Sequence, residues 1–228
     1  MRYTDINGCI FTQIQNKMNE VLLSALNNRY ATKKFDATKK IPIETVDALI
    51  EAIRLTPTSY GLQLMKVVLV QDQALREALV SHAFGQRQIA DASHLLILCR
   101  EKEANASHIN DYIENIADTR SIHVDNLIGF KNMMHNTVLK MTPSEQEDWM
   151  KKQVYIALGN LLTSCAVLGV DACPMEGFMP AAFDNVLGLQ DMNLASVLVI
   201  PIGYRAEDDK NATIKKVRRP LPEFLVKI

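Results

Sequence analysis

One long segment around residue 155 restricts the fold more than any other part of the chain. Ser144 and Glu147 have the spacing of a capping box, and Gly169 suits the end of a helix, so we expect one helix between them. From Val154 to Leu168 the apolar side chains occur on nearly all sides of that helix, so all of its sides must be buried. The pattern leaves open whether a second subunit covers it or whether it is the central helix of a monomer.

Short apolar runs on both sides of this helix predict a β-sheet. Residues 66–70 and 95–99 are continuous enough to be central strands. Residues 170–173 are expected to form a short strand, and residues 196–200 another that ends before Pro201. These four runs are sufficient for one sheet.

Helical segments surround the predicted strands. Pro42 opens a helix with apolar residues at helical spacing, and Asp72 can cap another that runs to about Phe84. Residues 101–143 are polar and helical and should form an excursion over the outside near the site, and a helix follows at 180–187. Because helices outnumber strands without strict alternation, the predicted class is α+β, a mixed central sheet flanked by helices with a long buried central helix.

Composition and missing motifs exclude several classes of protein. With 25 basic and 26 acidic residues, general electrostatic binding to nucleic acid or a membrane surface is not expected. No apolar run reaches the roughly 18 residues of a membrane span. The histidines and cysteines lack metal-ligand spacing, so no metal site is predicted, and there is no Rossmann, P-loop or G-x-S-x-G motif.

The cysteines indicate a reducing environment. None of the four has a C-x-x-C partner, and Cys99, Cys165 and Cys173 lie in apolar segments, which predicts buried free thiols. Such thiols suit a cytoplasmic protein. We therefore expect a cytoplasmic location.

Basic residues gather at two places far apart in the sequence. Arg29, Lys33 and Lys34 lie on a short connection between two predicted helices, and a second cluster occupies residues 215–219. An arginine and a lysine on one side of an extended segment suit an extended anion, since arginine forks onto a phosphate and lysine acts as a point charge. The alternatives are a solvated basic loop and, for 215–219, a solvated tail or targeting patch.

Short motifs follow one another in a fixed order from about Met18 to about Pro220. They are the Arg-Tyr-Ala-Thr-Lys-Lys-Phe-Asp segment at 29–36, Pro-Thr-Ser-Tyr-Gly-Leu-Gln at 57–63, Asp-Ala-Ser-His at 91–94, the 149–160 segment, Pro-Met-Glu-Gly-Phe at 174–178, and Asn-Ala-Thr with Lys-Val-Arg at 211–218. Each motif is weak alone. Their order and spacing together resemble the nitroreductase family of FMN enzymes.

The resemblance implies a fold and an activity. The fold would be nitroreductase-like, an obligate homodimer with FMN at the subunit interface, made of a single domain at 18–228 after an N-terminal extension at 1–17. The activity would be that of an FMN-dependent NAD(P)H oxidoreductase, with ping-pong, two-electron (hydride) reduction of nitroaromatics, quinones or related flat acceptors. NADH or NADPH would be the co-substrate; the motifs identify neither the nucleotide nor the physiological acceptor. The expected partners are a second copy and a small aromatic acceptor, without nucleic acid or membrane.

The resemblance also assigns roles to residues. Arg29, Lys216 and Arg218 match the contacts to the flavin phosphate. Lys33 matches a cation beside the pyrimidine edge that supports the reduced flavin electrostatically, and the Glu176-Gly177 turn presents a backbone N–H to the ring. No residue is assigned as a certain acid, base or nucleophile. The complete set of candidate cofactor-binding residues is Arg29, Tyr30, Ala31, Thr32, Lys33, Thr58, Ser59, Gly61, Gln86, Gln88, Pro174, Met175, Glu176, Gly177, Lys216 and Arg218.

Several positions depart from the family pattern. Ala31 replaces a serine that often contacts the phosphate, a loss of about 1 kcal/mol for one neutral hydrogen bond. Gly61 replaces an asparagine on a loop that, in the family, covers the flavin of the neighbouring subunit. Gln86 and Gln88 stand where related enzymes carry an asparagine and a lysine. These changes bear on substrate choice more than on flavin binding.

Two further predictions remain open. Phe130, on the polar excursion, is a candidate for the substrate pocket, with helix packing as the alternative. A non-catalytic flavin- or phosphate-binding interaction protein that kept the fold is the alternative to the enzyme.

Overall fold

The predicted α+β class is confirmed. The computed structural model describes the backbone of residues 6–228 and side chains from residue 14 onward. Its sheet has the strand order β1-β2-β4-β3. The strands are β1 (Met65–Val70), β2 (His94–Glu101), β3 (Asp171–Ala172) and β4 (Leu194–Gly203). All three ladders are antiparallel, and in the described part of the chain parallel pairing occurs only in the bridge Ala31–Ala172, so the mixed character of the sheet is confined to that bridge.

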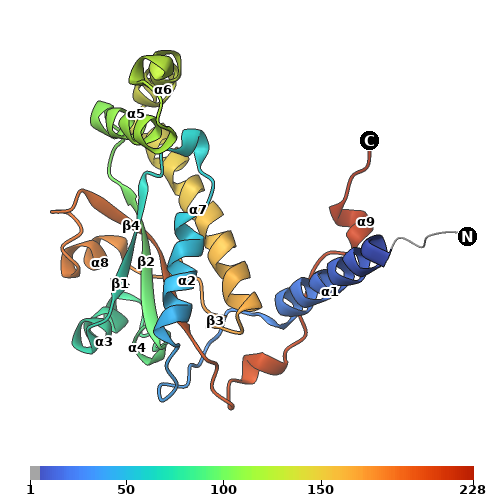
Figure 1. The fold of residues 1–228 in the computed structure, drawn as a ribbon. Helices are drawn as coiled ribbons and strands as arrows, with labels where there is room; N and C mark the ends of the chain where they lie inside the picture. The colour runs from blue at the N-terminus through green and yellow to red at the C-terminus, as the bar shows by residue number, and fades with distance from the viewer. Residues whose placement is uncertain (1–5) are drawn as a thin grey trace, which may run out of the picture.

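Helices cover both faces of this sheet (Figure 1). The longer ones are α1 (Ile6–Asn28), α2 (Ile43–Arg54), α3 (Gln73–His82), α5 (Ala106–Arg120), α6 (Ile128–Thr137) and α7 (Pro143–Val167). The shorter ones are α4 (Gln88–Asp91), α8 (Pro180–Val186), α9 (Leu221–Phe224) and the 3-10 turns η1 (Ser59–Gly61), η2 (Val124–Leu127), η3 (Val138–Lys140) and η4 (Lys210–Thr213).

The alternation of β2 divides the main core into two layers. Leu95 and Ile97 point to the face covered by α3, α4 and α8, and Leu96 and Leu98 point to the face covered by α2 and α7. Successive side chains of a strand face opposite ways, so a strand that is apolar throughout must be covered on both sides. The continuous apolar run in the sequence is thereby explained.

The helix α7 begins two residues earlier than predicted. Thr142 and Glu145, and not Ser144 and Glu147, form the capping box. Starting there places Pro143 in the first turn, where its missing N–H costs no hydrogen bond.

One side of α7 stays open in the single chain. Val154, Ala157 and Leu161 are fully buried against the sheet and α2, whereas Ile156 is 47% and Val167 is 45% exposed. The burial expected on all sides is therefore not reached within one chain. A second subunit would cover this face, and the homodimer stays a prediction.

A third apolar cluster joins the excursion to the start of α7. Ile109 and Ile113 of α5 pack with Met134 of α6 and Met150 of α7. This cluster lies at one end of the molecule, beyond the sheet (Figure 1). Residues 101–143 therefore form a helical excursion, as predicted.

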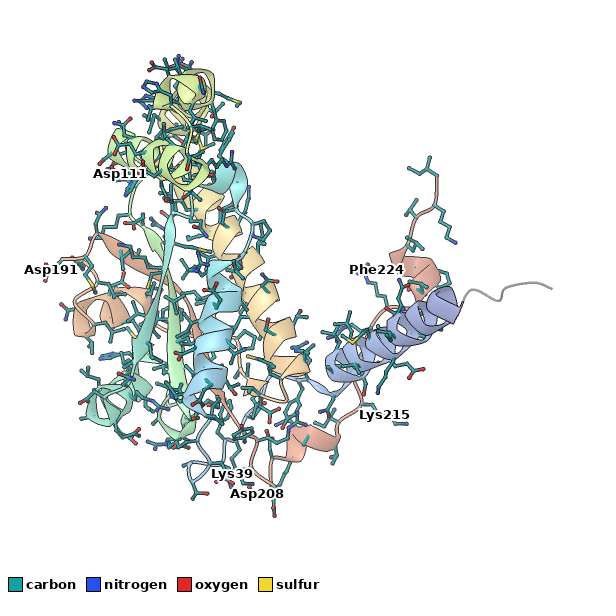
Figure 2. All side chains as sticks on the ribbon, in the orientation of Figure 1. Lys39, Asp111, Asp191, Asp208, Lys215 and Phe224 are labelled. Atoms are coloured by element: carbon teal, nitrogen blue, oxygen red, sulfur yellow. The ribbon has the colours of Figure 1, made fainter. Side chains whose placement is uncertain are left out.

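The two ends of the described chain project from the body. Figure 2 labels Lys215 and Phe224 on the C-terminal segment, which turns away from the sheet in the direction taken by α1. Apolar side chains on α1 and on the C-terminal segment are exposed to solvent: Met18 is 59% exposed and Phe224 is 77% exposed. The helix α1 ends at Asn28, just before the basic connection, and continues without a break across position 18. The expected boundary between an N-terminal extension (1–17) and the domain (18–228) stays a prediction.

Strand β4 continues past its expected end. It reaches Gly203 because the carbonyl of Pro201 still accepts a hydrogen bond, 3.0 Å from the Cys173 nitrogen. Cys99, Cys165 and Cys173 are buried free thiols, as predicted. None of the described helices combines the length and apolar character needed to cross a membrane.

Candidate functional site

A cavity of about 450 Å³ brings together cations from both basic clusters of the sequence. It lies between the end of α1 and the segment around η4, and its cations are Arg29, Lys215, Lys216 and Arg218. The remaining lining residues are Asn27, Asn28, Tyr30, Ala31, Asn211, Ala212 and Ile214, none of them acidic. Cations without a carboxylate beside them form a site for an anion.

The cations of this cavity affect one another. The Lys216 ammonium donates a hydrogen bond to the carbonyl oxygen of Arg29, a residue 187 positions away in sequence. Burial lowers the pKa of Lys216, and the charges of Arg29 and Arg218 lower it further. A bound anion would relieve this repulsion.

Asp209, which was not among the predicted site residues, holds the first cluster in place. Its carboxylate accepts hydrogen bonds from the Tyr30 hydroxyl at 2.8 Å and from the backbone N–H groups of Lys33 at 3.0 Å and Lys34 at 3.2 Å. Burial alone raises the pKa of Asp209, but hydrogen bonds from Asn211, Tyr30, Lys33 and Lys34 outweigh it and lower the pKa to about 2. A charged Asp209 therefore ties the 29–36 segment to η4.

Tyr30 supports the same junction with its ring. The guanidinium carbon of Arg205 lies 4.6 Å from the ring centroid, and Arg205 is paired with Asp171 of β3. Burial, followed by the hydrogen bond to Asp209, raises the pKa of Tyr30 to about 12. The phenol thus stays a neutral donor beside the cavity.

Lys33 lies on the same connection as Arg29 but does not line the cavity. Its backbone is fixed by Asp209, and its side chain is exposed and forms no ion pair with the described residues. Burial raises the pKa of Cys173, and the nearby Lys33 charge opposes that rise. The ammonium is thus near the residue that precedes Pro174 and is free to meet a ligand.

The segment from Pro174 to Phe178 forms an exposed turn between two anchored ends. Met175 exchanges backbone hydrogen bonds with Val199 of β4, at 2.8 and 3.1 Å, while Glu176 and Gly177 are exposed. Among the described residues neither the Glu176 N–H nor the Gly177 N–H has an acceptor. This exposed turn therefore carries two peptide donors without a partner among the described residues.

Gln86 reaches this turn, but Gln88 is turned inward. The Gln86 amide nitrogen donates to the Gly177 carbonyl oxygen at 2.8 Å. Gln88 is 8% exposed within α4. Thr32 is also fully buried, and its hydroxyl lacks a partner among the described groups.

Residues 58–61 lie elsewhere in the single chain. Thr58 and Ser59 are held locally, through Gln63 N–H donating to the Thr58 hydroxyl and Ser59 N–H donating to the Gln153 side chain. None of these residues lines the cation cavity, and η1 lies toward α5, at the end of the molecule away from β3 (Figure 1).

Phe130 packs against the same loop. Its ring centroid lies 6.4 Å from that of Tyr60, which in turn lies 6.4 Å from that of Trp149. Gly61 has φ +81°, and an added Cβ would lie 2.0 Å from the Tyr112 hydroxyl. The expected role of Phe130 over a substrate pocket stays a prediction.

The donors present suit a flavin phosphate and ring. Four cations without an acid would hold a phosphate of nearly two negative charges. Lys33 and the free N–H groups of the 174–178 segment would face a ring with acceptor atoms. Within the described residues, no group of three or more His, Cys, Asp or Glu side chains could hold a metal ion.

Comparison with known proteins identifies the family of this chain. Residues 26–204 match the model of the nitroreductase family. A Staphylococcus aureus protein provisionally named an NAD(P)H nitroreductase is 34% identical over 209 residues, which cover 87% of this chain and 93% of that protein.

Solved structures show the same fold. A nitroreductase-like protein from Streptococcus mutans has a TM-score of 0.78 at 23% identity, covering 92% of this chain and 99% of that one. A provisionally named nitroreductase from Exiguobacterium sibiricum, solved in complex with FMN, has a TM-score of 0.75 at 15% identity, covering 91% and 97%. With both the family model and the sequence relatives in agreement, this chain belongs to the nitroreductase family.

Proposed function

We propose that the protein is an FMN-dependent NAD(P)H oxidoreductase that reduces nitroaromatics, quinones or related flat acceptors by two electrons. The observation that carries the proposal is the acid-free cavity that joins Arg29 to Lys216 and Arg218. Its lining residue Ala31 forms a bridge with Ala172, two residues before the 174–178 turn. The names of the staphylococcal relatives and the FMN complex of a structural neighbour support it.

Each group of residues has a distinct task in this proposal. Bound FMN would supply the hydride chemistry. Arg29, Lys216 and Arg218 would hold its phosphate, Lys33 would stabilise negative charge on the reduced ring, and the Glu176–Gly177 peptides would orient the ring. Lys33 acts by charge and not by proton transfer, because a lysine ammonium is a poor acid at neutral pH.

The complete site would require a second copy of the chain. Thr58, Ser59 and Gly61 do not reach the cation cavity of their own chain, and one side of α7 is open with apolar residues such as Ile156. A homodimer that buries this face would bring residues 58–61 of one subunit to the flavin of the other. The interface would be large and apolar, as in obligate dimers.

Sedimentation tests this assembly. The FMN-loaded protein should sediment as a dimer at the lowest measurable concentrations, because an obligate apolar interface does not dissociate without unfolding. A stable, FMN-loaded monomer would contradict the proposal.

Nucleotide and acceptor are proposed to occupy the site in turn, which gives ping-pong kinetics. Initial-rate plots should be parallel; intersecting plots would indicate a ternary complex. The fold constrains the chemical class of the acceptor less than it constrains the cofactor. A gut-bacterial enone reductase has the same fold at a TM-score of 0.74.

Anaerobic titration tests the activity directly. NADH or NADPH should bleach the flavin absorbance of the FMN-loaded protein, and a nitroaromatic or quinone should restore it. A protein that binds FMN but is not bleached by either nucleotide would favour the non-catalytic alternative.

A further inference from the structure

The exposed turn at 174–178 is held by side chains from two separate elements. Gln86, between α3 and α4, donates its amide to the Gly177 carbonyl oxygen at 2.8 Å and to the Ala83 carbonyl oxygen at 3.1 Å. Tyr155 of α7 donates its hydroxyl to Glu176 Oε1 at 2.5 Å. The two hydrogen bonds are therefore made to adjacent residues of the turn, Gly177 and Glu176.

The backbone alone restrains only the ends of this turn. Met175 is 4% exposed and paired with Val199 on both its N–H and its carbonyl, and Phe178 is 6% exposed. Between them, the only described backbone contact is the Phe178 N–H donating to the Glu176 carbonyl oxygen at 3.0 Å. The direction of the free N–H groups therefore depends on the two side chains.

We infer that Gln86 and Tyr155 are positioning residues that aim the peptide N–H groups of Glu176 and Gly177 at an acceptor atom of the bound ligand. Identifying that ligand as FMN rests on the proposed function. Gln86 then acts through the carbonyl of the turn and not by its own contact with the cofactor. Donors fixed before binding stabilise a ligand more than mobile ones, because no reorganisation is needed.

The Tyr155 contact persists at ordinary pH. The hydrogen bond to Glu176, followed by burial, raises the pKa of Tyr155 to about 12, so the phenol stays protonated and can donate. The carboxylate of Glu176 is thereby held toward α7.

Gln86→Met and Tyr155→Phe test this inference, because each removes a donor and nearly keeps the shape. Gln73→Met is the matched control: Gln73 also donates its amide to a backbone carbonyl, that of Ala90 at 3.2 Å, but does not touch the turn. The first readout is hydrogen–deuterium exchange, in FMN-free protein, of the Phe178 N–H, which is the one that the Glu176 carbonyl protects within the turn. Both variants should exchange several-fold faster there than wild type, and the control should not.

The second readout is the midpoint potential of the FMN-loaded proteins. An N–H aimed at the hydride-accepting nitrogen favours oxidised flavin, in which that nitrogen is an acceptor. Loosening the turn should therefore raise the potential, by roughly 20 mV for a fivefold change in a two-electron equilibrium.

The outcomes separate the inference from the proposed function. Unchanged exchange in both variants would overturn the inference, as would faster exchange with an unmoved potential or an equal shift in Gln73→Met. A wild-type protein that binds no FMN would refute the proposed function instead, and the exchange readout would still decide whether the two side chains hold the turn.

Discussion

The two ends of the candidate site differ in what they are made of. At the cavity end, Arg29, Lys216 and Arg218 are charged and have no acid among them. At the turn, the donors without a partner are neutral peptides, held by the Gln86 amide and the Tyr155 phenol. Full charges supply binding energy to an anion, whereas fixed dipoles select the orientation and electronic state of a ring.

The two ends also differ in how they are supported. The cavity joins segments from opposite ends of the sequence, and the buried carboxylate of Asp209 connects them. The turn is attached to β4, in the middle of the sheet order, through Met175 and Val199. The cavity should therefore be sensitive to charge and acid, and the turn to small changes of shape.

Removing a cavity arginine should have the largest effect. Arg29→Ala and Arg218→Ala should each weaken FMN binding by about 2 kcal/mol or more, or roughly 30-fold, the range for charged hydrogen bonds. Fluorescence titration measures the loss. Arg219→Ala is the control, because Arg219 is exposed and does not line the cavity. An equal loss in the control would show that overall charge, and not the cavity, holds the phosphate.

Acid should weaken the junction at Asp209. Its folded pKa of about 2 lies below the ordinary value of 3.8, so its contribution is complete above about pH 4 and is lost as the pH falls toward 2. At neutral pH that contribution to the free energy of unfolding is on the order of 2 kcal/mol. Denaturant unfolding of wild type and Asp209→Asn should give a difference that shrinks between about pH 4 and pH 2. A difference independent of pH would contradict this role.

Changing the ring-side cation should have a smaller effect. Lys33→Met should lower the midpoint potential of bound FMN by about 30 mV, a tenfold change for a two-electron couple, and should slow reduction by NADH or NADPH. The pH profile of the rate should not change. Lys34→Met is the control, since the Lys34 ammonium pairs with Asp208. If both variants left the potential unmoved, Lys33 would not stabilise the reduced ring.

Local patterns predicted the central parts of the fold well. The apolar runs at 66–70 and 95–99 became β1 and β2 because strands covered on both faces must be apolar throughout. The start of α7 was misplaced because two Ser/Thr-x-x-Glu patterns, at Thr142 and Ser144, overlap. Only the position of Pro143 distinguishes them.

The candidate site was predicted less completely. The resemblance grouped Arg29 with Lys216 and Arg218, and all three line one cavity in the structure. Asp209 was missed because it is one of three consecutive acids. Its signal was the Asn-Ala-Thr that follows, because Asp209 accepts the Asn211 N–H at 3.0 Å and opens η4. Neither Gln86 nor Tyr155 could be assigned to the turn from sequence, since both contacts join distant segments.

Comparing FMN with riboflavin tests the central claim most directly, because riboflavin lacks only the phosphate. If the cavity holds the phosphate, wild type should bind FMN on the order of 1000-fold more tightly than riboflavin, as expected for two charged hydrogen bonds of about 2 kcal/mol each. The Arg29→Ala/Arg218→Ala double variant should lose most of this preference and keep only the part that Lys215 and Lys216 supply. Equal affinities in wild type, or an unchanged ratio in the double variant, would contradict the assignment.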